Sequence, residues 1–185
     1  MRTSIFTLLL LTGSLLTYLQ VDAQRYITKN GYVSFYSDTP LETILSTNNQ
    51  VNCALDVSTG DMVFKVLMKS FTFEKALMQE HFNETSVESD KYPNCIFQGE
   101  VANLDQVDFS KPGTYDAIVE GDLTLHGITH HISEKGTFTV EDDVIKGHSV
   151  FNLVPADYKI TVPKTVIRNI ADVVEVTIDV ELHKL

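Results

Sequence analysis

Basic residues are scarce in this sequence. It contains 14 lysines and arginines against 25 aspartates and glutamates, which gives a formal net charge of −11 at pH 7. Proteins bind phosphate backbones and anionic membrane surfaces largely through lysine and arginine, so this charge balance argues against both kinds of partner. We therefore expect no nucleic-acid partner, and we attribute the acidity to the solubility of the chain.

Cysteine is almost absent. The two cysteines, Cys53 and Cys95, each lie on the apolar face of their own predicted strand, beside Leu55 and Phe97 respectively. In an exported protein two cysteines can form a disulfide. Two buried free thiols would instead act as small hydrophobic side chains. The sequence leaves both arrangements open.

The common catalytic signatures are missing too. The sequence has no Gly-x-Ser-x-Gly, no His-Glu-x-x-His and no glycine-rich phosphate loop. We therefore expect no enzymatic activity and no cofactor. A less favoured alternative is a small-molecule hydrolase or isomerase that uses His81 or His130 with a nearby acid such as Glu134.

Three histidines, His126, His130 and His131, lie within six residues and raise the question of a metal site. A tetrahedral site needs three or four side chains that converge on one ion. On the strand alternation described below, His126 points outward at a turn, while the adjacent His130 and His131 point to opposite faces. Because these directions diverge, we expect no metal ion here.

Long apolar runs are confined to the N-terminus. Arg2 precedes an apolar stretch over residues 5–19, and the small residue Ala23 closes the segment, which is typical of an export signal. We expect residues 1–23 to be cleaved, leaving a soluble periplasmic or secreted chain of one domain over residues 24–185. No later stretch reaches the ~20 apolar residues that a membrane-spanning helix needs, so we expect no stable membrane anchor.

The rest of the chain alternates mostly with a period of two, which predicts strands with one buried face. The predicted strands cover residues 26–28, 31–37, 51–57, 62–73, 95–101, 114–126, 128–140, 144–153 and 173–182. Short turns separate several of them, so neighbours should pair as antiparallel hairpins. About eight long strands with one apolar face form either a sandwich or a closed barrel, and their length favours the barrel.

One segment breaks this period. Residues 73–82 place Phe73, Leu77, Met78 and Phe82 at helical spacing, with charged and polar residues opposite. We predict one short amphipathic helix that packs on the sheet near the entrance to the barrel. His81 lies at the border of its apolar stripe, where it could bond to the head group of a ligand.

Several motifs resemble the YceI-like family of exported bacterial proteins, in the same order and at matching spacing over essentially the whole mature chain. They are Lys69–Phe73, Leu77–Phe82, Asp90–Pro93 with Phe97 and Gly99, Gly121–Thr129, Phe151 with Asp157–Ile160, and the valine-rich last strand. The resemblance implies an extended, lipocalin-like antiparallel barrel of eight strands around a long apolar cavity. It also implies a polyisoprenoid or another amphiphilic lipid as ligand.

From these patterns we predict a non-catalytic carrier that sequesters a polyisoprenoid, quinone-like or fatty-acyl lipid inside the barrel. The residues expected to line the cavity and its mouth are Phe35, Phe64, Phe71, Phe73, Leu77, Met78, His81, Phe82, Phe97, Leu123, Leu125, Phe138, Phe151 and Tyr158. Small residues such as Gly99 and Gly121 are expected to leave space inside. The alternative is a barrel filled by its own side chains that acts through its exterior or as a homodimer.

Overall fold

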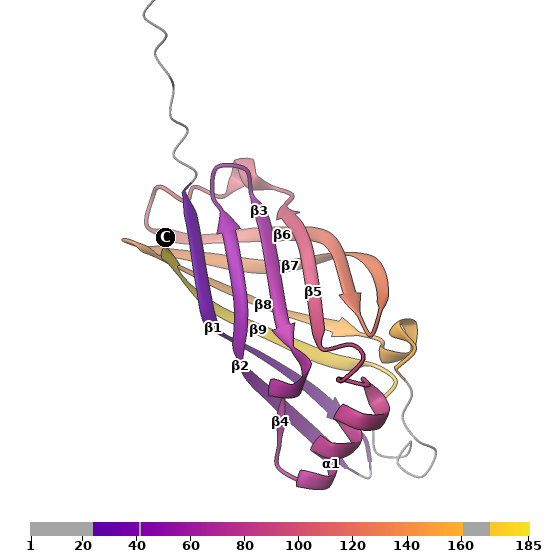
Figure 1. Cartoon of the computed structure of the whole chain (residues 1–185). Coiled ribbons are helices and arrows are strands. Elements are labelled where there is room, and N and C mark those ends of the chain that lie inside the picture. Colours follow the sequence, from indigo (N-terminus) through magenta and orange to yellow (C-terminus); the bar gives the residue numbers. More distant parts are fainter. Residues whose placement is uncertain (1–23, 41, 161–170) are drawn as a thin grey trace, which may run out of the picture.

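The computed structural model describes residues 24–40, 42–160 and 171–185. The predicted export signal, residues 1–23, lies outside the described residues. Within them the chain forms a long barrel with a helix at one end (Figure 1). None of the helical segments in these ranges has the length and hydrophobicity that a membrane-spanning helix requires.

Eight long strands in the described residues form the barrel wall. They are β1 (Arg25–Asp38), β2 (Thr43–Asp56), β3 (Asp61–Leu67), β5 (Asn94–Val101), β6 (Gly113–Leu125), β7 (Ile128–Glu141), β8 (Val144–Leu153) and β9 (Val174–Lys184). Neighbours pair antiparallel in the order β1-β9-β8-β7-β6-β5-β3-β2, and β1 also pairs with β2. The sheet is therefore closed, which confirms the predicted eight-stranded antiparallel barrel.

Strand β1 joins two segments that the sequence pattern predicts separately. Its pairing with β2 shifts register on both sides of Gly31, and this irregularity interrupts the alternation. A Cβ atom at Gly31 would lie 2.8 Å from Cγ1 of Val180. Glycine at this position therefore allows close packing inside the barrel.

The first half of β2, residues 43–50, was not predicted as a strand. Its inward positions include Ser46 and Asn48, which are fully buried but polar, so the apolar alternation is lost. The hydroxyl of Ser46 donates to the carbonyl of Thr72 (3.0 Å), and the amide of Asn48 donates to the carbonyl of Leu67 (2.9 Å). These bonds satisfy one backbone carbonyl at the end of β3 and one in the short segment Thr72–Phe73 that follows.

The predicted strand over residues 62–73 is split. A 3₁₀ turn, Met68–Ser70, follows β3, and a two-residue strand β4 (Thr72–Phe73) then pairs with β2. The predicted helix also starts later, because Phe73 belongs to β4. Helix α1 (Ala76–His81) continues as a π-helical turn, Phe82–Ser86, to give one 11-residue helix.

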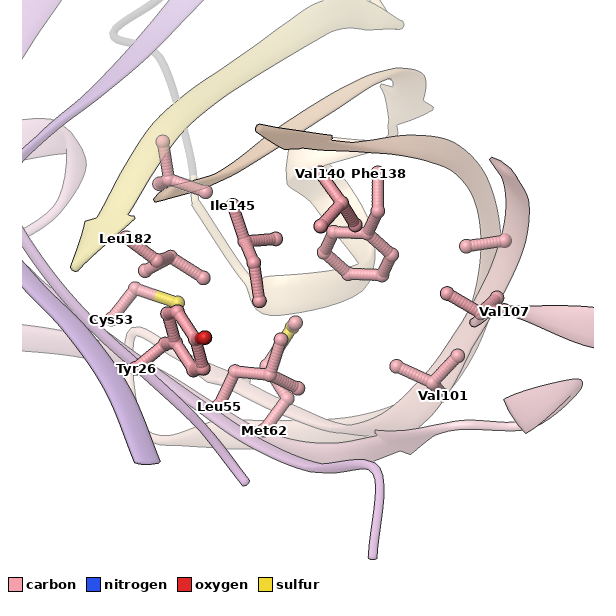
Figure 2. Close-up of a cluster of buried hydrophobic side chains, with 12 residues drawn as sticks. Tyr26, Cys53, Leu55, Met62, Val101, Val107, Phe138, Val140, Ile145 and Leu182 are labelled. Atoms are coloured by element: carbon pink, nitrogen blue, oxygen red, sulfur yellow. The ribbon is translucent and has the colours of Figure 1, made fainter. Parts of the chain in front are cut away.

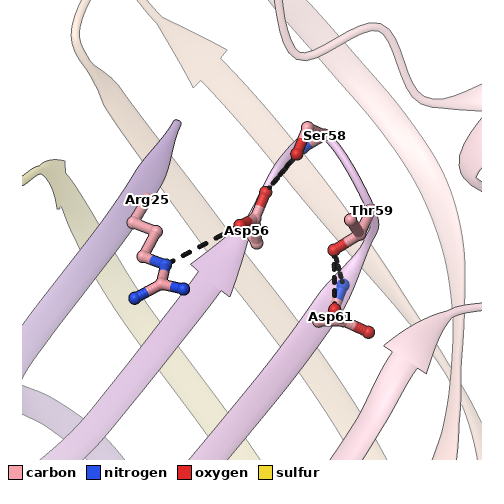
Figure 3. Close-up of polar contacts among 5 residues, drawn as sticks. All are labelled: Arg25, Asp56, Ser58, Thr59 and Asp61. Carbon is pink, nitrogen blue, oxygen red and sulfur yellow. Dashed lines mark hydrogen bonds and ion pairs between the residues drawn. The ribbon is translucent and has the colours of Figure 1, made fainter. Parts of the chain in front are cut away.

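The β2–β3 turn shows how short polar residues hold one end of the barrel (Figure 3). The carboxylate of Asp56 accepts hydrogen bonds from the hydroxyl (2.5 Å) and the backbone N–H (3.0 Å) of Ser58. These bonds, together with Arg25 at 3.7 Å, lower the pKa of Asp56. Gly60 completes the turn at φ +82°, a conformation that glycine adopts without strain.

The end of the barrel that carries this turn is filled by a cluster of apolar side chains, which we call the closed-end core. Figure 2 shows its members pointing toward one another from the surrounding strands, with Leu55, Ile145 and Leu182 fully buried. Burial of such side chains supplies about 1.5–3 kcal/mol each. The closed-end core therefore stabilises the barrel and seals this end.

We predict that Leu55→Ala lowers the free energy of unfolding by about 2–5 kcal/mol, because it leaves a void in the closed-end core. Leu45→Ala on the same strand is the matched control, since the side chain of Leu45 is 54% exposed. Urea unfolding followed by circular dichroism measures both. Equal losses for the two variants would contradict the assignment of the core.

Candidate ligand-binding cavity

A cavity of about 270 Å³ lies between the closed-end core and the helix. Its wall consists mostly of inward-facing residues of the barrel strands, and Met78, His81 and Phe82 of the helix also contribute to it. Small-molecule pockets usually start at about 300 Å³, so this space is narrow and suits a slim ligand. The interior of the described barrel is thus only partly filled by its own side chains.

Most of the residues predicted to line the site do contact the cavity. They are Phe35, Phe64, Phe71, Phe73, Met78, His81, Phe82, Phe97, Leu123, Leu125, Phe138 and Phe151. Two others do not belong to its wall. Leu77 points away from the barrel and is 61% exposed, because the helix starts three residues later than predicted. Tyr158 is buried and packs against the ring of His130.

Four phenylalanines close the helix end of the cavity. The ring of Phe35 on β1 lies 5.5 Å from that of Phe71, 5.8 Å from that of Phe73 and 5.6 Å from that of Phe82. The rings of Phe73 and Phe82 are 5.0 Å apart. Such contacts add about 0.5–1.5 kcal/mol per pair to the burial of the rings. This helix-end aromatic cluster holds the helix on the barrel.

Much of the cavity wall is aliphatic and was not among the predicted site residues. The missed residues include Val33, Val66, Met68, Ile132, Val176 and Ile178. Most of them occupy inward positions of the predicted strands, so the same alternation could have identified them. Phenylalanines were chosen as cavity-lining residues because of their size, and the size of a side chain does not indicate where along the barrel it lies.

Two glycines that were expected to leave space in the cavity instead allow two neighbouring strands to approach closely. Gly99 and Gly121 face each other across β5 and β6. A Cβ atom at Gly121 would lie 2.4 Å from the carbonyl oxygen of Gln98, and one at Gly99 would lie 2.1 Å from that of Glu120. These glycines allow two backbones to approach closely, and neither belongs to the cavity wall.

The three clustered histidines have separate partners. His126 lies in the β6–β7 turn, where its Nδ1 donates to the carbonyl of Tyr158 (3.0 Å) and its Nε2 pairs with Glu88 (2.9 Å). His130 contacts the carbonyl of Asp157 (3.1 Å). His131 pairs with Asp122 on the exterior. Within the described ranges no group of three or more potential metal ligands gathers.

The residues of the enzymatic alternative do not form a catalytic arrangement. His130 and Glu134 both face inward from β7, but Nε2 of His130 is directed to the carbonyl of Asp157. His81 lies in the helix on the cavity wall. Neither histidine forms a hydrogen bond or an ion pair with Glu134 among the contacts of the described residues.

Cys53 and Cys95 are free thiols. They lie on β2 and β5, opposite Phe64 and Val66 of the intervening β3. Two strand spacings alone place them about 9–10 Å apart, and the two-residue offset along β3 increases this distance, whereas a disulfide requires Cα atoms within about 7 Å. Burial raises the pKa of each thiol to about 12.

We predict that both thiols react slowly with iodoacetamide in the native protein at about pH 8, because a raised pKa keeps the thiol protonated and unreactive. Unfolding in urea should expose both to rapid alkylation, which intact mass reports as two adducts. Ser133→Cys, at an exposed position of β7, is the control and should gain one adduct quickly in the native state. Rapid double alkylation of the native wild-type chain would contradict the raised pKa of the thiols.

Comparisons with known proteins place this geometry among related barrels. Residues 28–182 match the model of the YceI-like domain. No curated protein matches the chain. Three solved structures are similar to it: a polyisoprenoid-binding domain from Saccharophagus degradans implicated in plant cell wall breakdown, BcnA from Burkholderia cenocepacia, and a YCEI protein from Campylobacter jejuni.

The likeness to these structures is one of fold. The Saccharophagus degradans domain has a TM-score of 0.76 at 12% identity, over 88% of this chain and 99% of that one. BcnA has a TM-score of 0.67 at 14% identity, over 82% and 95%. The Campylobacter jejuni protein has a TM-score of 0.55 at 14% identity, over 99% of both chains.

Proposed function

The chain belongs to the YceI-like domain family, and on that premise we propose that it is a non-catalytic binding protein for an apolar or amphiphilic lipid. The lipid is a polyisoprenoid, a quinone-like molecule or a fatty-acyl compound. The observation that carries the proposal is the unfilled apolar cavity of about 270 Å³ beneath the helix. The polyisoprenoid-binding domain among the similar structures supports the chemical class.

Burial is the proposed mechanism. Each CH₂ group that leaves water for the apolar interior contributes about 0.8 kcal/mol. A tail of about twelve carbons would then contribute about 10 kcal/mol when it is fully buried, which offsets an association cost in the lower part of the estimated range of about 4–15 kcal/mol.

The helix supports a role in retention of the ligand. Its residues Met78, His81 and Phe82 belong to the cavity wall, and Phe82 contacts Phe35 and Phe71 in the helix-end aromatic cluster. The apolar tail of a bound ligand would fill the cavity next to these rings and make contacts with them. We therefore expect the ligand to strengthen the packing of the helix on the barrel.

We predict that Val119→Phe abolishes lipid retention, because Val119 lines the cavity and a larger ring fills it. Ile118→Phe is the matched control, since the next residue of β6 is 38% exposed on the outer face. Native mass spectrometry of protein from its own host would show a co-purified lipid in wild-type and Ile118→Phe protein only. Retention by a folded Val119→Phe variant would overturn the cavity as the binding site.

We further propose that the protein is exported and begins at Gln24 after cleavage of residues 1–23, since these residues have the composition of an export signal. The intact mass of protein from its own host should correspond to residues 24–185. A chain that retains residues 1–23 after secretion would contradict this proposal.

A further inference from the structure

Strands β7 and β8 separate halfway along the barrel. Their ladder runs from Glu141 and Val144 to Gly136 and Ser149, and no pairing with β8 follows on the side of residues 128–135. In contrast, β7 pairs with β6 over its whole length, and β8 pairs with β9 as far as Leu153. We call the place where this ladder ends and the two strands separate the β7–β8 seam.

The cavity extends to this seam. Its wall includes the inward-facing Glu134 and Ser149, and also Thr137 and His148, a cross-strand pair whose side chains face outward. Successive side chains of a strand point to opposite faces of the sheet. Because the cavity contacts both inward-facing and outward-facing side chains here, it reaches the place where the two strands separate. Toward the helix end, the seam is bounded by His130, which forms a hydrogen bond with the carbonyl of Asp157.

Glu134 is the one acidic side chain on the described wall of the cavity. It is half-buried and has no hydrogen bond or ion pair among the contacts of the described residues. Desolvation raises the pKa of its carboxyl group. An unpaired carboxyl group in apolar surroundings is unfavourable for the fold, and groups of this kind gather at functional sites.

The charges around Glu134 determine which ligand head groups can bind beside its carboxyl group. Its cross-strand neighbour is Val119, and no lysine or arginine contributes to the cavity wall in the described part of the chain. A carboxylate or phosphate at the seam would face a like charge that no lysine or arginine of the described wall compensates, in surroundings of low dielectric constant. A hydroxyl, amide or amine can instead donate a hydrogen bond to the carboxyl group.

We propose that the β7–β8 seam receives the polar end of the ligand and that Glu134 accepts a hydrogen bond from it, so that the protein binds lipids with hydroxyl, amide or amine heads and discriminates against carboxylate and phosphate heads. This inference rests on the proposed lipid-binding function. The apolar tail then runs from the seam toward the helix-end aromatic cluster. The helix covers the tail, whereas the head lies at the side of the barrel.

The test compares three ligands with the same tail: dodecanol, dodecylamine and dodecanoate, each displacing the fluorescent probe N-phenyl-1-naphthylamine at about pH 7.5, where the amine and the acid are charged. Wild-type protein should bind dodecanol and dodecylamine at least about tenfold more tightly than dodecanoate. Glu134→Gln removes the charge at nearly constant shape. It should tighten dodecanoate about tenfold, weaken dodecylamine and change dodecanol least.

Glu175→Gln is the matched control, because Glu175 is exposed on the outer face of β9 and its removal should leave all three affinities unchanged. Equal affinities of the three compounds for wild-type protein, with no effect of Glu134→Gln, would overturn the head-group assignment while leaving lipid binding intact. A lack of binding of all three compounds to wild-type protein, measured directly by isothermal titration calorimetry, would overturn the proposed function itself.

Discussion

Pairing of β1 with both β9 and β2 closes the sheet, and the other features of the structure depend on this closure. Antiparallel strands with one apolar face leave exposed edges unless the sheet closes on itself. Here the first and last described strands meet, and the backbone N–H of Leu185 donates to the carbonyl of Arg25 (2.8 Å). The barrel is therefore completed only when the last strand of the chain is in place.

Closure produces an interior whose two halves differ. Aliphatic side chains from every side meet in the closed-end core, which is tightly filled. Toward the helix the wall carries large rings, and those of Phe35, Phe71, Phe73 and Phe82 contact one another at the mouth. The cavity of about 270 Å³ lies between these rings and the closed-end core. Stability and an unfilled cavity are thus provided by different parts of one barrel.

The wall around the cavity is asymmetric as well. On one side Gly99 and Gly121 let β5 and β6 approach closely, and the β6–β7 ladder continues to the turn at His126. On the other side β7 leaves β8 at Gly136, and the carboxyl group of Glu134, which lies beside the gap, has no hydrogen-bond or ion-pair partner among the described residues. The carboxyl group of Glu134 can accept a hydrogen bond at this position. This supports the proposal that the polar end of the ligand lies at the side of the barrel.

Much of the wall could be predicted because side chains of a strand alternate between two environments. Strand β6 illustrates this: its predicted inner residues Ala117, Leu123 and Leu125 are all buried. The prediction failed where polar residues face inward and bind backbone groups, as Ser46 and Asn48 do in β2. It failed again at the helix, because Phe73 pairs with β2 and delays the first helical residue. Local periodicity contains no information about such partners.

The amino-acid sequence by itself determined the class of fold, the apolar face of each strand and the general character of the interior, since these follow from the local order of polar and apolar residues. Only the tertiary structure decided that Cys53 and Cys95 lie two strands apart, that Gly121 contacts a backbone rather than a cavity, and that Glu134 lies beside an interrupted ladder. Each of these depends on distances between strands that are remote in the chain, and such distances exist only once the barrel has closed.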